Sequence, residues 1–123
     1  MGTKKILVVD DDPDIQRLLK KRLESKGFSC ECAYTIEMAL QMLRDSEPNL
    51  VILDLGFQGA DGTAFLKNAK QWLPEKGHVP SVIVLSGHHE QDIVDYVIDL
   101  GASAFVKKPF DPDNLLSVIN TYL

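Results

Sequence analysis

The chain alternates between short apolar runs and longer stretches in which apolar residues recur at helical spacing. Short continuous apolar runs bounded by polar or turn-forming residues are typical of strands covered on both faces of a parallel sheet. Four such runs and one mixed segment around two cysteines predict five strands. These expected strands lie at residues 6–9, 30–33, 50–53, 82–85 and 104–106.

Each expected strand is followed by a stretch with the period of an amphipathic helix. Pro13 suits the first turn of the first helix, Asp12 is its expected N-cap, and Gly27 stops it. Thr35 and Asp111 are the expected N-caps of the second and last helices. The helices are expected from 13 to the stop at 27, from 35 to before 48, over 62–73, over about 90–100, and from 111 to 122.

Strands that alternate with helices predict an α/β fold, a single doubly wound (βα)5 domain spanning residues 1–123. Its central five-stranded parallel sheet has right-handed crossovers and helices on both faces. In such sheets, ligands bind outside the carboxyl ends of the strands, where the strand order reverses. Residues that follow the expected strands are therefore the first candidates for a functional site.

Chemically useful side chains follow four of the expected strands. Asp10 and Asp11 follow the first, Asp54 the third, Ser86 the fourth, and Lys108 lies past the fifth. Carboxylates brought together repel one another unless a cation or a lysine shares the site, and a hard cation with few protein ligands is typical of Mg²⁺. Asp54 is then placed to attack phosphorus, with the hydroxyl and the ammonium near the transferred group. Each residue alone fits a cap, a turn or a solvated side chain, and the combination is what indicates a phosphoacceptor centre.

Charge and cysteine content narrow the classes of function. A net charge of −5, from 18 acids against 13 bases, argues against nucleic-acid binding by this segment, and no apolar stretch has the length of a membrane span. Cys30 and Cys32 are expected to be a buried structural pair in a reduced, cytoplasmic compartment. A zinc site would need two more ligands, and His78, His88 and His89 lack zinc-like spacing.

The chain resembles the response-regulator receiver domain of two-component signalling, which is CheY-like, over essentially its whole length. This resemblance implies a flavodoxin-like strand order, 2-1-3-4-5. It implies that Asp54 is the phosphoacceptor, that Asp10 and Asp11 lie at a Mg²⁺ ion with Asp11 as the direct ligand, and that the Gly56 carbonyl also binds it. It further implies that Ser86 and Lys108 contact the phosphoryl group and that the rotamer of Phe105 follows the switch. The segments that carry the resemblance are 6–13, 51–54, 59–62, 85–87 and 105–110.

The resemblance also implies a mechanism and partners. A histidine kinase or a phosphotransfer protein would phosphorylate Asp54, and the surface formed by the fourth helix, fifth strand and fifth helix would change shape. An effector or a second copy of the chain would read that surface, which is rich in apolar residues. The domain would not be an enzyme in the usual sense, although slow Mg²⁺-dependent autophosphatase activity is expected. A single-domain regulator and one part of a longer regulator both fit the sequence.

Two departures from the family pattern and two rival functions accompany this interpretation. Phe57-Gln58 replaces the usual Met-Pro, which predicts a more mobile loop. His88 lies at a position that tends to influence dephosphorylation in the family, and an exposed loop histidine with no role is the alternative.

A haloacid-dehalogenase-like phosphatase, one rival function, usually has a second Asp where this chain has Gly56, and it carries a cap domain. The other rival is a phosphorylation-independent, receiver-like binding module.

Overall fold

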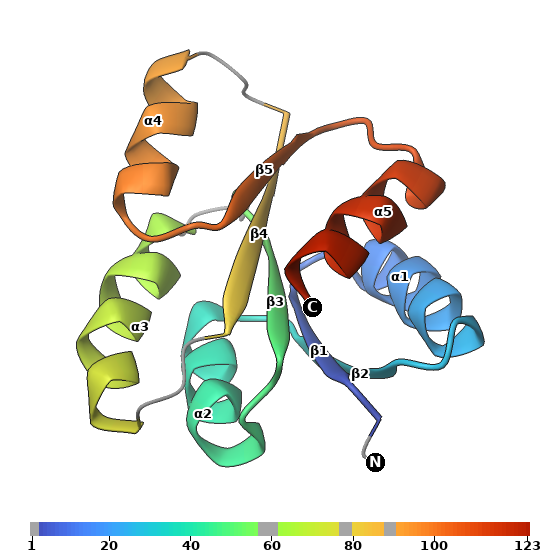
Figure 1. Cartoon of the computed structure of the whole chain (residues 1–123), viewed down its shortest axis with the longest axis horizontal. Coiled ribbons are helices and arrows are strands. Elements are labelled where there is room, and N and C mark those ends of the chain that lie inside the picture. The colour runs from blue at the N-terminus through green and yellow to red at the C-terminus, as the bar shows by residue number, and fades with distance from the viewer. Residues whose placement is uncertain (1–2, 57–61, 77–79, 88–90) are drawn as a thin grey trace.

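A computed structural model describes residues 3–56, 62–76, 80–87 and 91–123, without the side chains of residues 70–76. Strands and helices alternate strictly along the chain (Figure 1). The strands are β1 (Lys5–Val9), β2 (Ser29–Ala33), β3 (Leu50–Asp54), β4 (Ser81–Ser86) and β5 (Ala104–Lys107). The helices are α1 (Pro13–Ser25), α2 (Ile36–Ser46), α3 (Thr63–Lys76), α4 (Gln91–Asp99) and α5 (Pro112–Tyr122).

The strands form one parallel sheet in the order β2-β1-β3-β4-β5, which confirms the predicted doubly wound fold. Helices α1 and α5 cover one face, and α2, α3 and α4 cover the other (Figure 1). Each face has its own layer of buried aliphatic side chains. The order of neighbouring strands reverses between β1 and β3, which is where such folds bind their ligands.

Local sequence signals account for the helix starts. The side chains of Asp12, Thr35 and Asp111 each accept a hydrogen bond from a backbone N–H in the first turn of the following helix, as predicted. Gly27 follows the end of α1 with a φ of 91°, a conformation that L side chains rarely adopt. No helix in the described part of the chain is long and apolar enough to cross a membrane.

Some boundaries differ from those predicted. Asp54 and Ser86 are the last residues of their strands, since strand pairing between β3, β4 and β5 continues one position beyond the apolar runs. The prediction that both cysteines are buried is wrong for Cys32. Cys30 is buried, whereas Cys32 is only half-buried, because β2 lies at the edge of the sheet.

Candidate phosphoacceptor site

The ends of four strands bring the predicted site residues to one edge of the sheet. Asp54 ends β3 and Ser86 ends β4, while Asp10 and Lys108 each lie one residue beyond β1 and β5. The backbone N–H of Lys108 donates to the Ser86 carbonyl at 2.8 Å, which extends the β4–β5 ladder to the lysine. The fold therefore positions these residues through strand register, before any side chain interacts.

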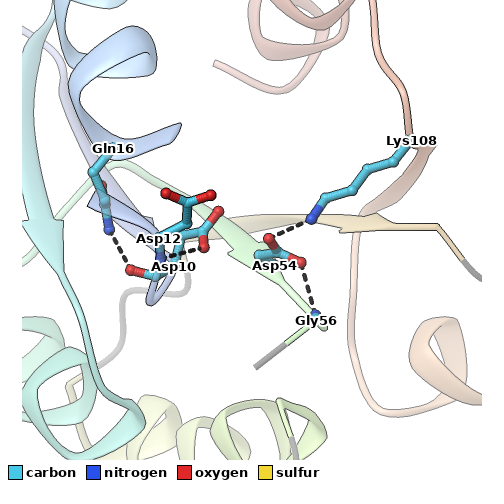
Figure 2. Close-up of polar contacts among 6 residues, drawn as sticks. All are labelled: Asp10, Asp12, Gln16, Asp54, Gly56 and Lys108. Carbon is cyan, nitrogen blue, oxygen red and sulfur yellow. Dashed lines mark hydrogen bonds and ion pairs between the residues drawn. The ribbon is translucent and has the colours of Figure 1, made fainter. Parts of the chain in front are cut away.

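The Asp54 carboxylate lies at the centre of this edge and is 5% exposed. Its Oδ1 accepts a hydrogen bond of 2.7 Å from the Gly56 backbone N–H. Its Oδ2 forms an ion pair with the Lys108 ammonium, which reaches across from the end of β5 (Figure 2). Both oxygens are thus oriented, and a positive charge balances the buried carboxylate.

The Asp10 carboxylate is more deeply buried, at 2% exposure. Its Oδ1 accepts a hydrogen bond of 2.9 Å from the Asp12 backbone N–H. The buried Oδ2 atom has no hydrogen-bond partner within the described residues. The pKa of the Asp10 carboxyl is raised to about 7, first by burial and then by the neighbouring Asp54 carboxylate, against lowering effects of the Asp12 N–H and of Lys108.

This arrangement fits a hard divalent cation. A buried carboxylate oxygen without a partner, next to a second carboxylate, is a position where a cation would offset repulsion and desolvation. Within the part of the chain that is described, no three His, Cys, Asp or Glu side chains gather as a metal cluster, and Asp11 is exposed. Mg²⁺ is often held by one or two carboxylates and several waters, so a pair of buried acids is a sufficient core for it.

Gly56 leaves the space beside the Asp54 carboxylate open. A Cβ atom at this position would lie 3.1 Å from Asp54 Oδ1 and 3.8 Å from Lys108 Nζ. The first distance is tighter than ordinary van der Waals contact, so any side chain here would press on the carboxylate. The absence of a side chain therefore keeps access to Asp54 clear.

Ser86 and Phe105 lie beside this centre on the adjoining strands. Ser86 is buried, at 3% exposure. Phe105 is half-buried, pairs with Val84 in the β4–β5 register, and packs against the core layer on the α4 side. The roles implied for Ser86 and Phe105, a phosphoryl contact and a rotamer switch, stay predictions. Phe57, Gln58 and His88 lie outside the described residues.

An apolar rim beside the acidic centre was not predicted. The acids and Lys108 share one open groove with Ile15 and Leu18 of α1 and with Phe110. Leu18 is 46% exposed, although it follows the helical spacing of the other apolar residues on α1. The sequence carries no signal for this exposure, because the four apolar residues of α1 have the spacing of a single stripe and that spacing does not distinguish its buried centre from its margin.

Gln16 is a second residue that sequence reasoning missed. It is a polar side chain at 1% exposure, on the same face of α1 as the buried Leu19 and Leu23. Its amide donates to backbone carbonyls at the ends of β1 and β2. The signal was its spacing of three and seven positions from those two leucines, which places an amide on the buried face.

The chain is thus a doubly wound α/β domain with acids, a hydroxyl and a lysine at one edge of its sheet. A family model described as the response regulator receiver domain matches residues 6–120. The chain therefore belongs to the response regulator receiver domain family of two-component signalling.

Three relatives illustrate this membership. The nitrogen assimilation regulatory protein NtrX of Azorhizobium caulinodans is 38% identical over 115 residues, 92% of this chain and 24% of that protein. The KDP operon transcriptional regulatory protein KdpE of Escherichia coli is 36% identical over 105 residues, 85% of this chain and 44% of that protein. The crystal structure of the receiver domain of NtrX from Brucella abortus is 37% identical, with a TM-score of 0.84, covering 96% of this chain and 97% of that one. The chain thus spans less than half the length of these two curated relatives.

Proposed function

We propose that Asp54 is the phosphoryl acceptor of this receiver domain. The observation that carries the proposal is the setting of its carboxylate, which is buried, oriented by the Gly56 N–H, and paired with the Lys108 ammonium. A carboxylate held in this way has a fixed direction of approach to an incoming phosphorus atom. The donor is a histidine kinase or a phosphotransfer protein.

In the transfer step, one Asp54 oxygen forms a bond to phosphorus while the bond from phosphorus to the donor atom breaks. The electron pair of the broken bond stays with the donor, which takes up a proton. Lys108 then lies next to the new phosphoryl oxygens, where its mobile ammonium neutralises part of their charge. Ser86, at the end of the neighbouring strand, supplies a hydroxyl for another phosphoryl oxygen.

The donors for a Mg²⁺ ion are the carboxylates of Asp10, Asp11 and Asp54 and the backbone carbonyl of Gly56. When bound, Mg²⁺ would neutralise charge on the transferring oxygens. Asp10 holds its Oδ2 atom, which has no partner among the described residues, at the site because the Asp12 N–H fixes its other oxygen. Asp11 extends the acidic pair at the exposed side of the same groove.

Phosphorylation would act as a switch by adding charge and acceptor oxygens at Asp54. If Ser86 and Lys108 gain phosphoryl contacts, the start of the β4–α4 segment is drawn toward the site and Phe105 is free to turn inward. The surface over α4, β5 and α5 then changes, and an effector or a second copy of the chain binds it. Exposed Tyr96, Ile98 and Tyr122 supply apolar area for that contact. A kinase donor and reduced cysteines fit a cytoplasmic location.

Two rival functions differ from this one in what they do with phosphate. An aspartate-based phosphatase is not favoured, because the chain belongs to the receiver family and has Gly56 where such enzymes place a second acid. A phosphorylation-independent module would keep the fold but leave Asp54 unmodified. Slow Mg²⁺-dependent loss of the phosphoryl group is expected of the proposed receiver.

The test is the intact mass of the protein after incubation with Mg²⁺ and acetyl phosphate, with Asp54→Asn as the matched variant. One added phosphoryl group on the wild type alone is the expected result. Release of phosphate without an adduct would indicate rapid autophosphatase activity. If no adduct forms and no phosphate is released, the result would support the phosphorylation-independent module instead.

A further inference from the structure

Gln16 links the first turn of α1 to the ends of two strands. Its Nε2 atom lies 2.9 Å from the Val8 carbonyl oxygen, 3.0 Å from that of Asp10 and 2.9 Å from that of Ala33. All three contacts are buried. In Figure 2 the Gln16 side chain points toward the backbone of Asp10, where the chain leaves β1. A single amide group therefore joins β1, β2 and α1 at the edge that carries the site.

The orientation of this amide follows from its surroundings. Three carbonyl oxygens surround the same atom, so only the nitrogen end of the amide can face them. The amide has two hydrogens and three acceptors, so at least one hydrogen is shared between two carbonyl oxygens. The Oε1 atom at the other end is buried and has no partner among the described residues. The side chain thus donates to carbonyl groups at the strand ends, while its own Oε1 atom is left without a partner among the described residues.

Gln16 completes a set of contacts that fixes Asp10. The Asp10 backbone N–H donates to the Ala33 carbonyl at 3.0 Å, and its carbonyl accepts from Gln16. Its carboxylate Oδ1 accepts from the Asp12 N–H. The backbone is held on both sides and the carboxylate is held through one oxygen, so among the described residues only Oδ2 of Asp10 has no hydrogen-bond partner. The direction of that oxygen depends on where the Asp10 backbone lies.

We propose that Gln16 is a positioning residue for the cation site, acting through the backbone of Asp10 rather than by touching the ion. This inference rests on the proposed function, because it takes Asp10 as a ligand for Mg²⁺. Residues that orient metal ligands affect metal affinity by about 10–100-fold when they are replaced. A purely structural role would instead make Gln16 one more part of the core, whose loss lowers stability without a specific effect on the ion.

The test compares Gln16→Met with Ile119→Val, using the dissociation constant of Mg²⁺ measured by calorimetry. Methionine keeps the size and helix propensity but removes the donor, and Ile119 is a buried core residue on α5, outside the groove that holds the acids. We expect Gln16→Met to weaken Mg²⁺ binding by about tenfold or more, and Ile119→Val to change it less than about twofold. Equal Mg²⁺ affinity of Gln16→Met and wild type would overturn the inference and leave the proposed function intact. Absence of Mg²⁺ binding by the wild type would overturn both.

A measurement on the wild type covers the case in which Gln16→Met does not fold. The side-chain amide of Gln41 is exposed on α2, where it donates to Asp45, and provides an internal reference. We expect the Gln16 amide protons to exchange with solvent much more slowly than those of Gln41 and to shift when Mg²⁺ is added. Exchange at the Gln41 rate, or resonances that do not respond to Mg²⁺, would contradict the positioning role.

Discussion

Lys108 Nζ and Asp54 Oδ2 form an ion pair across the edge of the sheet, although the two residues are 54 positions apart in the chain. The lysine therefore places a positive charge directly beside the buried Asp54 carboxylate. Transfer of a phosphoryl group to Asp54 would move the lysine's partner from the carboxylate to the phosphoryl oxygens. In the proposed function, the same contact would connect phosphorylation of Asp54 to the end of β5.

Replacing Lys108 should separate cation binding from switching. We expect Lys108→Ala to bind Mg²⁺ at least as tightly as the wild type, because a competing positive charge is removed. Phosphorylation should then no longer shift the Phe105 resonances, because β5 has lost its contact with the acceptor. Lys107→Ala, which removes an exposed lysine at the adjacent position, is the control. Wild-type shifts of Phe105 on phosphorylation of Lys108→Ala would contradict this role.

The charge of Asp10 should be costly for the fold and necessary for the cation. In Asp10→Asn the buried repulsion with Asp54 disappears, and the new amide can donate to the Asp54 carboxylate. At about pH 8, without metal, we expect the free energy of unfolding to rise by about 1 kcal/mol or more. Stabilisation by added Mg²⁺ should be lost in the same variant.

Asp14→Asn is the matched control for Asp10→Asn, because it removes one acid from the exposed surface of α1. It should change the free energy of unfolding by less than about 0.5 kcal/mol and should keep the response to Mg²⁺. Denaturant unfolding with and without Mg²⁺ measures both quantities. A lower free energy of unfolding for Asp10→Asn than for the wild type would show that the charged Asp10 carboxylate does not destabilise the fold.

A methyl group at position 56 should slow phosphorylation. In Gly56→Ala the new Cβ lies 3.1 Å from Asp54 Oδ1, so the carboxylate or the loop must shift. We expect the rate of phosphorylation by acetyl phosphate to fall by about tenfold, because a small displacement of the attacking atom is costly. Gly87→Ala adds the same group where no atom lies within 4 Å, and its rate should stay near that of the wild type. Equal rates for the two variants would refute the steric argument.

The two cysteines should differ in reactivity. Burial raises the pKa of the Cys30 thiol to about 12, helped by the neighbouring Cys32, and burial also raises the pKa of Cys32. Because the thiolate is the reactive form, a raised pKa lowers reactivity at about pH 8. Only Cys32 is also partly exposed, so iodoacetamide should modify it first, and Cys30 should react mainly after unfolding. Mass mapping that finds equal modification of both in the folded protein would contradict this order.

The strand ends explain why so much of the arrangement was predictable. Asp10, Asp54 and Ser86 directly follow an apolar run, Lys108 comes two residues after one, and a parallel sheet collects those ends at one edge. The runs themselves fixed the five strands, because continuous apolar sequence suits strands covered on both faces. Alternating elements then left few topologies to consider.

The features that escaped prediction depend on contacts between distant segments. The three hydrogen bonds of Gln16 join α1, β1 and β2, and the periodic pattern of apolar residues does not predict which distant backbone groups a side chain will contact. Leu18 looked like a core residue because helical spacing cannot tell a buried stripe from its exposed margin. The exposure of Cys32 depends on β2 being an edge strand, which is a property of the whole sheet.

Reduction of the phosphorylated protein with borohydride identifies the residue that carries the phosphoryl group. Borohydride converts an aspartyl phosphate to homoserine and leaves an ordinary aspartate unchanged, so peptide mass analysis identifies the modified position. After incubation with Mg²⁺ and acetyl phosphate, we expect homoserine at position 54 and at no other acid. Homoserine at Asp10 or Asp11, with Asp54 unchanged, would contradict the proposed role of Asp54.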